Sequence, residues 1–504
     1  MEKYDVIVVG LGPSGSLASL LLDTYGLKVL AIEKSKDIYP LPRAVTISDQ
    51  GMRIAQLADI EEIYLNNSTE LGGACFVDGN LDLIGGTIDL EGYVSSNGWP
   101  ASRLFHQPYT DQSIRKKLLK SNVKVLLGHE LSEIENNNND VYAYIEDLNF
   151  KKKIKYSSKY LLGCDGSNSL VRKLLKIPQI DLRYNRNWVV VDIKLKGENK
   201  LGDKVIQVCD KKRLATFVPS HLPFRRWEFL VHDNERKDDF LEDKNIQELI
   251  SKWLEPDEYE IIRKAVYQFH SMIAEKFQKG NCFLTGDAAH QSPPFMGEGM
   301  MSGYRDVVNL CWKIALTIKL KLQNELLNSF EKERIPHSKF VVENSAGIGE
   351  LMEAYAEAKD PKQVPQELVK RGYGSFTLPD LKEGLFFDGK ANEEMKSGTL
   401  FPQPIRYLDK KIDARLDSLL GKGFCLISSN EFTLNKENLE FLKSIDCNLL
   451  VLNKKIIEKS PYLKPLMEKD KVFLVRPDRY IFGSTTSKVS LDNLVENLKH
   501  TLKI

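Results

Sequence analysis

The chain has 504 residues, 42% of them hydrophobic, which allows two or three domains with sizeable cores. Its 71 Lys and Arg against 70 Asp and Glu leave a net charge of +1, so no nucleic-acid partner is expected. No apolar run approaches the roughly 20 residues of a membrane span, and the N-terminus lacks the apolar segment of a signal peptide. The seven cysteines are scattered without a CxxC pair. We expect a cytoplasmic protein with reduced thiols and no metal site.

The first nucleotide-binding pattern lies at the N-terminus. Residues 4–9 predict a buried strand, followed by a G-x-G-x-x-G turn and a helix at 16–25. A second strand at 28–32 ends at Glu33, where a carboxylate can take ribose hydroxyls. The pattern predicts an α/β Rossmann-type site for FAD or NAD, because the acid disfavours the 2′-phosphate of NADP. The candidate residues are Gly10, Gly12, Pro13, Ser14, Gly15, Glu33 and Lys34.

Two weaker patterns follow in chain order. A proline-rich turn at 39–42 precedes Arg43. Residues 103–108, which include Gln107, then open a helix expected at 109–119. Taken alone, these patterns are also typical of a solvated turn and an ordinary helix start.

A third motif lies near the middle of the chain. A strand at 159–163 runs into Asp165 and Gly166, and a helix that carries Arg172 follows. An Asp-Gly turn that caps a helix is the alternative interpretation of this pattern.

Residues 181–278 predict mainly strands, with a helix at 246–253. The pattern favours an antiparallel sheet over a second dinucleotide domain, because it contains no glycine-rich strand-to-helix turn. The aromatic residues Trp188, Phe217 and Trp227 either line a pocket in this sheet or fill its core. If the protein is an enzyme that uses NAD(P)H, it has no second dinucleotide domain to hold this cofactor permanently and must meet it transiently.

The most informative stretch is 281–314. Its apolar start, at 282–284, predicts a buried strand that ends at Gly286 and Asp287. A loop rich in glycine and proline then precedes a helix expected from Ser302. Free backbone N–H groups at a helix start suit an anion or a polarised carbonyl, and a strand-end carboxylate can accept hydrogen bonds from a sugar. An ordinary strand–turn–helix connection is the alternative.

Together these motifs resemble those of the class A flavoprotein monooxygenases, aromatic hydroxylases with the para-hydroxybenzoate hydroxylase fold. The sequence GDAAHQSPPFMGEGM, at 286–300, is similar to that family's second flavin motif, and the resemblance extends from residue 1 to about 350. It implies an enzyme that binds FAD, meets NAD(P)H transiently and uses O2 to hydroxylate a small aromatic substrate, phenolic or polyketide-like, through a flavin C4a-hydroperoxide. The catalytic candidates are Pro293, Gly297 and Gly299, beside the reactive edge of the flavin.

The same resemblance implies the remaining cofactor contacts. Arg43 would lie near the flavin and the path of NAD(P)H, and Gln107 would hold the sugar or phosphate region. The second flavin motif and the Asp-Gly turn supply further candidates: Asp165, Gly166, Asp287, Pro294, Gly297, Glu298, Gly299 and Met300. Glu298 replaces a glutamine that is usual in the family, and its charge would disfavour reduced flavin unless it points outward.

The resemblance also implies a domain organisation. The FAD-binding domain takes residues 1–70, 101–180 and 279–357, the antiparallel substrate domain 71–100 and 181–278, a linker 358–400, and the tail 401–504. The tail resembles the thioredoxin-like domain appended to phenol hydroxylase and 3-(3-hydroxyphenyl)propionate hydroxylase. Since it lacks CxxC, we expect it to serve packing or the assembly of a homodimer.

Other functions fit the same motifs. The fold could act on an antibiotic-type scaffold or reduce an isoprenoid, and a flavin-binding protein without turnover is a third alternative. A halogenase is disfavoured because its GWxWxIP signature is missing. The sequence identifies neither the substrate nor the choice between NADH and NADPH.

Overall fold

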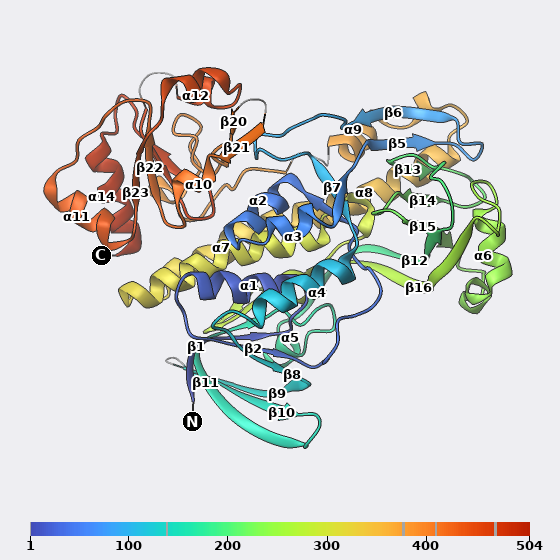
Figure 1. Ribbon diagram of the computed structural model, residues 1–504, viewed down its shortest axis with the longest axis horizontal. Coiled ribbons are helices and arrows are strands. Elements are labelled where there is room, and N and C mark those ends of the chain that lie inside the picture. The colour runs from blue at the N-terminus through green and yellow to red at the C-terminus, as the bar shows by residue number, and fades with distance from the viewer. Residues whose placement is uncertain (1, 138–139, 375–377, 409–410, 468–470, 504) are drawn as a thin grey trace.

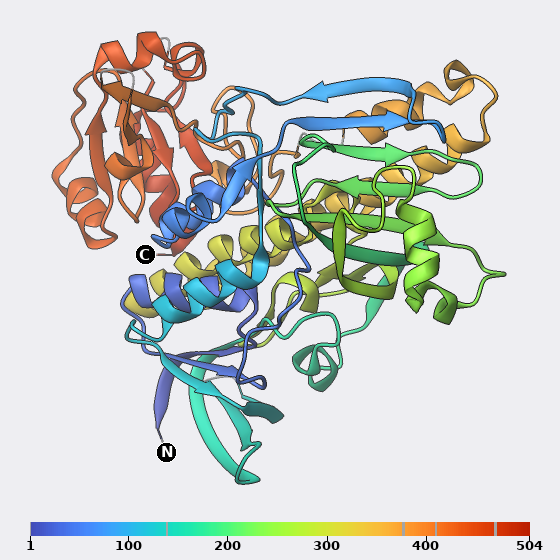
Figure 2. The same cartoon turned by 45° about the vertical axis from the view of Figure 1, so that its right-hand side comes forward.

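The computed structural model describes residues 2–137, 140–374, 378–408, 411–467 and 471–503 (Figure 1). Within them, the chain forms two eight-stranded sheets, and a four-stranded sheet in its C-terminal region. Figures 1 and 2 place the C-terminal region and the second large sheet at opposite ends of the molecule, with long helices between them. No helix in this described part is long and apolar enough to cross a membrane.

The first sheet has a parallel core. Four of its parallel strands are β1 (Lys3–Val9), β2 (Val29–Glu33), β11 (Lys152–Gly163) and β18 (Cys282–Leu284). The register pairs Val9 with Ile32 on one side and with Gly163 on the other, and it pairs Gly163 with Leu284. The carboxyl ends of these strands therefore lie at one edge. Three motifs that are far apart in the sequence meet there, as expected for a ligand site on an open α/β sheet.

Further strands and a set of helices complete this part of the molecule. The strands are β8 (Lys124–Leu127), β9 (His129–Asn136), β10 (Val141–Asp147) and β17 (Gln278–Lys279). The helices are α1 (Pro13–Thr24), α2 (Asp49–Leu57), α3 (Glu61–Leu65), α4 (Gln107–Leu118), α5 (Leu170–Leu174), α7 (Gly299–Leu320) and α8 (Glu325–Glu357). Helix α7 begins at Gly299 rather than at the expected Ser302, because the carbonyl of Glu298 already accepts the N–H of Ser302 at 2.8 Å.

The second sheet is mainly antiparallel and joins two segments of the chain. Its strands, in spatial order, are β19 (His290–Gln291), β16 (Tyr259–Ala274), β12 (Gln179–Leu195), β15 (Phe224–Val231), β14 (Ala215–Val218), β13 (Lys204–Val208), β5 (Gly73–Val77) and β6 (Leu83–Asp89). Strand β5 pairs in parallel with β13. Residues 73–89 therefore belong to the same sheet as residues 179–274, which we call the substrate sheet.

The two faces of the substrate sheet have different neighbours. The outer face packs Phe217 and Trp227 against helix α6 (Asp243–Ile250), so both aromatic side chains fill a core. On the inner face, Trp188 makes an edge contact with Phe295 of the second flavin motif, at 5.2 Å between ring centroids. Trp188 thus packs against the motif loop rather than against α6.

A separate small sheet holds the start of α2. It consists of β3 (Thr46–Ser48), β7 (Ser102–Phe105) and β4 (Ser68–Glu70). Ser48 caps α2 by accepting the N–H of Gly51 with its hydroxyl.

The C-terminal region has its own sheet and helices. The strands are β20 (Ile405–Leu408), β21 (Lys411–Arg415), β22 (Cys425–Ser428), β23 (Asn448–Val451), β24 (Phe473–Val475) and β25 (Ile481–Ser484). The helices are α10 (Asp417–Leu420), α11 (Lys436–Ser444), α12 (Lys454–Lys459), α13 (Leu463–Leu466) and α14 (Leu491–Leu502). The larger sheet has the order β23-β22-β24-β25, with β22 and β23 parallel and the other pairs antiparallel.

The stretch 358–400 was expected to be a linker with loops, but its described residues include a helix and buried side chains. It contains helix α9 (Gln366–Gly374), and its second half buries Leu385 and Met395 in a core shared with the C-terminal sheet. The burial of these two side chains ties the stretch to the C-terminal region.

Buried ion pairs fasten the C-terminal region to the long helices. Arg476 pairs with Glu333 of α8 at 2.7 Å, and both side chains are fully buried. Arg53 of α2 pairs with Asp417 of α10, also at 2.7 Å. Removing one partner would leave an uncompensated buried charge, so these pairs fix the orientation of the tail.

Candidate functional site

The first motif forms a tight turn between β1 and α1. Gly10 has a φ of +91°, and a Cβ added there would lie 2.6 Å from the carbonyl oxygen of Cys164. Only glycine fits such a position. Gly12 is the N-cap of α1 and provides no side-chain cap, and Pro13 begins the helix. The first N–H groups of α1 are therefore available to a ligand.

Glu33 holds this turn against the end of β2. Its carboxylate accepts the N–H of Leu11 at 2.7 Å and that of Ser35 at 2.9 Å. Lys34 is exposed beside it. These contacts place the acid where the sequence predicted it, at the turn and at the carboxyl end of the second strand.

Arg115 is a site residue that the sequence did not indicate. This buried residue of α4 donates from Nη2 to the carbonyl of Leu11 at 3.3 Å. Its Nε and Nη1 atoms are buried and find no hydrogen-bond partner among the residues that the structure describes. Leaving buried donors unpaired is costly, so the N-terminal turn fits an anionic or hydroxyl-rich ligand such as a dinucleotide.

Gln107 and Arg43 form one unit. The Gln107 side-chain oxygen accepts the backbone N–H groups of Arg43 and Ala44, each at 2.8 Å, and its amide donates to Asp111 at 3.1 Å. The Arg43 guanidinium lies 4.5 Å from the ring centre of Tyr39. Gln107 therefore shapes the turn that presents Arg43, and contact of either side chain with a cofactor stays a prediction.

The substrate sheet supports the same turn from the other side. Arg226 donates to the carbonyls of Pro42 and Arg43, at 2.6 and 2.8 Å. It is held by a buried ion pair with Asp192 at 2.7 Å. Arg226 thus fastens the substrate sheet to the nucleotide-binding part.

The carboxylate of Asp165 caps the start of helix α5. One carboxylate oxygen accepts the hydroxyl of Ser169 at 2.5 Å and the other accepts the N–H of Val171 at 3.0 Å, as in a helix cap. Gly166 has a φ of +78° and completes the turn. Arg172 donates to the carbonyl of Ala288 at 2.8 Å and so links this motif to the second flavin motif. A flavin contact of Asp165 stays a prediction.

Asp287 follows the end of β18. Its side chain is exposed, yet burial raises the pKa of its carboxyl. Among the described residues its carboxylate has no hydrogen-bond partner, which leaves its oxygens free for ligand hydroxyls.

The loop after Pro293 ends in the first turn of α7. Gly297 adopts a left-handed φ of +67°, and a Cβ there would lie 2.4 Å from the Thr46 hydroxyl oxygen. Pro293 precedes the 3-10 turn Pro294–Met296. Gly299 and Met300 are the first residues of α7, which has no side-chain cap. Their N–H groups are therefore free to face a carbonyl or an anion, and a flavin contact of this loop stays a prediction.

Glu298 is paired with a buried cation. Its carboxylate accepts a hydrogen bond from Nη2 of Arg305, whose Nε donates to Gln50 at 2.7 Å. The guanidinium offsets the charge that the substitution of the usual glutamine introduces. Glu298 therefore adds no unpaired charge to this loop.

Asp306 on α7 anchors the second flavin motif, and the sequence did not point to it. It accepts hydrogen bonds from His290 at 2.7 Å, from the N–H of Gly286 at 3.0 Å and from Arg334 at 2.9 Å. Burial acts to raise the pKa of Asp306, but the charges of His290 and Arg334 outweigh it and lower that pKa. His290 is thus a fixed partner of Asp306 rather than a free base.

His106 is also a packed residue. Its ring stacks on Phe224 at 4.2 Å and contacts Tyr109 at 4.3 Å. Burial lowers its pKa to about 4, so it is neutral at physiological pH.

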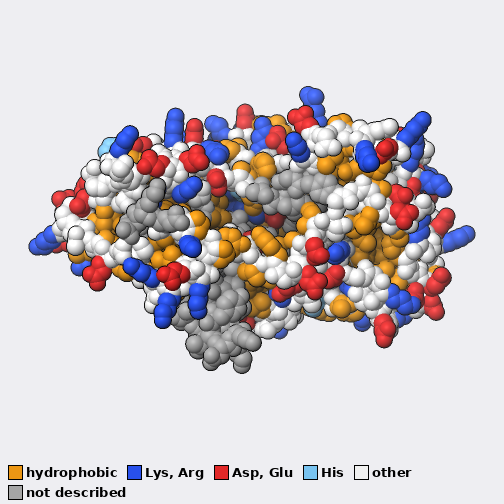
Figure 3. Space-filling model, turned by 90° about the horizontal axis from the view of Figure 1, so that it is seen from above, with side chains coloured by type: hydrophobic (Ala, Val, Ile, Leu, Met, Phe, Trp, Pro, Cys, Tyr) orange, Lys and Arg blue, Asp and Glu red, His pale blue; other side chains and the backbone are white. Residues whose placement is uncertain are grey.

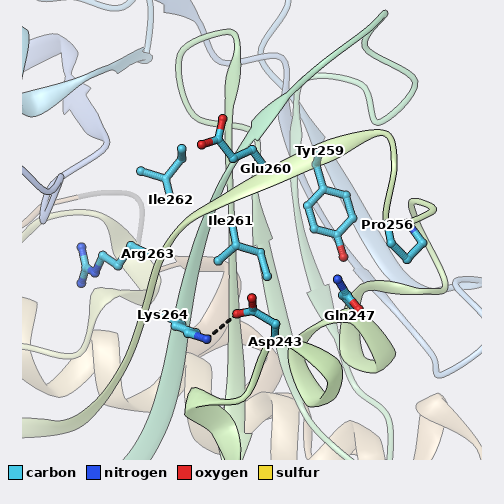
Figure 4. Close-up of a pocket in the computed structure, with 9 residues that line it drawn as sticks. All are labelled: Asp243, Gln247, Pro256, Tyr259, Glu260, Ile261, Ile262, Arg263 and Lys264. Atoms are coloured by element: carbon cyan, nitrogen blue, oxygen red, sulfur yellow. Dashed lines mark hydrogen bonds and ion pairs between the residues drawn. The ribbon is translucent and has the colours of Figure 1, made fainter.

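An open groove between α6 and β16 lies outside this constellation (Figure 4). Asp243 and Lys264 form an ion pair across it, and its lining contains none of the motif residues. On the face that Figure 3 shows, basic and acidic side chains are interspersed, with apolar side chains between them.

Comparisons with known proteins agree with this geometry. Residues 3–345 match the family model described as FAD binding domain, and residues 398–501 match the HcaD C-terminal domain. The chain is 26% identical over 517 residues to a probable NADH-specific resorcinol 4-hydroxylase of Rhodococcus jostii (strain RHA1), covering 99% of this chain and 95% of that protein. It is 31% identical over 455 residues to 3-(3-hydroxy-phenyl)propionate/3-hydroxycinnamic acid hydroxylase of Escherichia coli O8 (strain IAI1), covering 84% and 78%.

Solved structures share the fold along the whole chain. Aklavinone-11 hydroxylase in complex with FAD and aklavinone superposes with a TM-score of 0.81, at 19% identity and full coverage of both chains. The flavin-dependent monooxygenase PieE gives 0.80, at 17% identity and 99% coverage of each. Because the matched family model spans most of the chain, this protein belongs to the family of FAD binding domain proteins.

Proposed function

We propose that the protein is an FAD-dependent monooxygenase that hydroxylates a phenolic compound with NAD(P)H and O2. The observation that carries the proposal is the meeting of three nucleotide-binding motifs at one sheet edge, beneath the inner face of the substrate sheet. The names of the two relatives favour a single-ring phenol such as resorcinol or 3-(3-hydroxyphenyl)propionate. The NADH-specific relative makes NADH the first nicotinamide to test.

Each part of the site has a task in this proposal. The start of α1 and Arg115 would hold the pyrophosphate region, and Asp287 would accept hydroxyl groups of the cofactor. The free N–H groups at the start of α7 would stabilise negative charge on a ring carbonyl. FAD, when bound, supplies the centre that accepts a hydride and activates O2. The aromatic side chains Trp188 and Phe295 would help to exclude water.

The direct test combines a spectrum with a turnover assay. Purified protein should show flavin absorbance, and resorcinol or 3-(3-hydroxyphenyl)propionate should accelerate its NADH oxidation and gain one oxygen atom. Flavin without a response to any phenol would shift the proposal to a larger scaffold. A protein that binds no FAD, even when FAD is added, would contradict the proposal.

We also propose that the C-terminal region has a thioredoxin-like fold without redox activity. Its order β23-β22-β24-β25, with a helix between the parallel strands and another after the hairpin, supports this topology. Burial raises the pKa of Cys425 to about 12, which disfavours a reactive thiolate.

We propose a cytoplasmic homodimer as the working assembly. The seven free thiols support a reducing compartment, and the exposed Leu449 and Val451 on edge strand β23 offer an apolar contact. Sedimentation of the wild type and of L449K would test the assembly, since a charged side chain should dissociate a dimer formed there.

A further inference from the structure

A row of polar side chains crosses the inner face of the substrate sheet. Glu228 on β15 is directly opposite Thr216 on β14, and Thr216 is opposite Gln207 on β13. Residues opposite each other in a sheet point to the same face. The hydroxyl of Thr216 donates to the side-chain oxygen of Gln207 at 2.6 Å, which orients that amide. All three side chains are buried.

The neighbours of Glu228 along β15 show what this row faces. Two residues earlier, Arg226 reaches the carbonyls of Pro42 and Arg43. Two residues later, Leu230 pairs across the strands with Trp188, which packs on Phe295 of the second flavin motif. Since residues two apart share a face, Glu228 lies between the two loops that flank the proposed flavin site.

The carboxyl of Glu228 has no partner in the described part of the chain. The residue is only 4% exposed, yet its side chain takes part in no hydrogen bond or ion pair there. Both of its carboxyl oxygens nevertheless keep some exposed surface. An unpartnered carboxyl that is nine-tenths buried and still touches open space is expected to face a ligand.

The two arginines near Glu228 are paired with other groups. Arg226 and Arg263 both pair with Asp192 and both bind the carbonyl of Pro42. Burial raises the pKa of Glu228 to about 7, against the opposing effect of Arg226, and Asp192 raises it further. Arg263 acts to lower it. The carboxyl is thus a stronger base than an ordinary glutamate while still ionised in a large fraction near neutral pH.

We propose that Glu228 accepts a hydrogen bond from the phenolic hydroxyl of the substrate and takes its proton, with the amide of Gln207 as a second contact. This inference rests on the proposed function. The phenolic O–H bond breaks, the proton forms an O–H bond on the carboxylate, and the electron pair stays on the phenolic oxygen. That oxygen then donates electron density to the ortho and para carbons, which become better nucleophiles. Water returns the proton to solution after product leaves.

The first test uses FAD-loaded wild type and E228Q. Resorcinol and 1,3-dimethoxybenzene are titrated while the flavin absorbance is followed. The wild type should bind resorcinol at least about tenfold more tightly than the dimethoxy analogue, and E228Q should lose most of that preference. Equal preference in both proteins would overturn the inference.

The second test is the pH profile of resorcinol-stimulated NADH oxidation. In the wild type kcat/KM should rise through about pH 7, whereas E228Q should be roughly 100-fold slower at high pH and flat. Q207L should raise KM and keep the wild-type profile, which separates binding from proton transfer. An E228Q profile with the wild-type midpoint would overturn the inference.

Controls separate this inference from the proposed function. E260Q alters an exposed acid on the same sheet and should match the wild type. If the wild type holds FAD but no phenol stimulates it, the proposed function fails. If phenols stimulate wild type and E228Q equally, only the role of Glu228 fails. Should E228Q not fold, E228D tests the same pH profile with the charge kept and the reach shortened.

Discussion

The two faces of the substrate sheet carry opposite kinds of residue on the same strands. In β15, Trp227 and Phe229 point outward to α6, while Arg226 and Glu228 point inward to the flavin motifs. The outer face is a closed apolar core. The inner face buries ion pairs, which contribute little net stability as whole units although removing a single partner is costly. The strand period of two therefore places residues that stabilise the fold next to residues that serve the site.

A substitution on the outer face of the substrate sheet should cost the most free energy of unfolding. W227A would remove a fully buried side chain and leave a cavity against α6, so we expect a loss of about 3–5 kcal/mol in the free energy of unfolding. Urea denaturation measures it. F150A, which truncates a side chain that is 81% exposed, is the control and should change little. A loss below about 1 kcal/mol in W227A would contradict the assignment of this face as a core.

The next largest loss of stability should follow a substitution in the inner-face ion pair between Arg226 and Asp192. R226M removes one of the two cations that hold Asp192 and frees the carbonyl of Arg43, while Arg263 still binds the carbonyl of Pro42. We expect a loss of about 3 kcal/mol together with weaker FAD binding, because the turn at Arg43 loses its support. K200M breaks an exposed pair with Glu258 and should cost less than about 1 kcal/mol. If R226M binds FAD as tightly as the wild type, Arg226 of the substrate sheet does not support the FAD site.

The substitution E228Q, on the inner face, should stabilise the protein above neutral pH. The folded pKa of Glu228, about 7, is above its ordinary value of 4.5, so its contribution to stability is full below about pH 4.5 and is lost as pH rises through 7. A neutral glutamine avoids this loss, which is on the order of 3 kcal/mol at high pH. The melting temperature of E228Q should therefore exceed that of wild type near pH 8 and match it near pH 4.5. The opposite pH trend would show that the carboxylate is paired.

The smallest effect is expected in the motif loop. E298Q keeps an acceptor for Arg305 and removes only the charge, so it should cost about 1 kcal/mol and retain FAD. E298A, which also removes the acceptor and leaves Arg305 without that partner, is the stricter variant. Thermal denaturation and the flavin content of both variants check this ranking.

Local patterns in the sequence predicted much of the fold. Strand β18 has the expected bounds, and the three motifs meet at one edge as the Rossmann pattern implies. These features depend on apolar periodicity and on glycine, which are local signals.

The rest of the site depends on contacts between distant segments. Asp306 joins His290 and Arg334, and Arg115 reaches back to Leu11. No local periodicity encodes which strands pair, so the sequence could not tell that Trp188 faces the motif loop and Trp227 a core. A single glutamate within the apolar run of β15 was the one local sign of Glu228.

The most direct measurement is the turnover of resorcinol by FAD-loaded protein under isotopically heavy dioxygen, with NADH as reductant. The account predicts a hydroxylated product that carries one heavy oxygen atom, and far less of it from E228Q than from wild type. NADH consumption that yields only hydrogen peroxide with every phenol tested, or a product whose new oxygen comes from water, would contradict it.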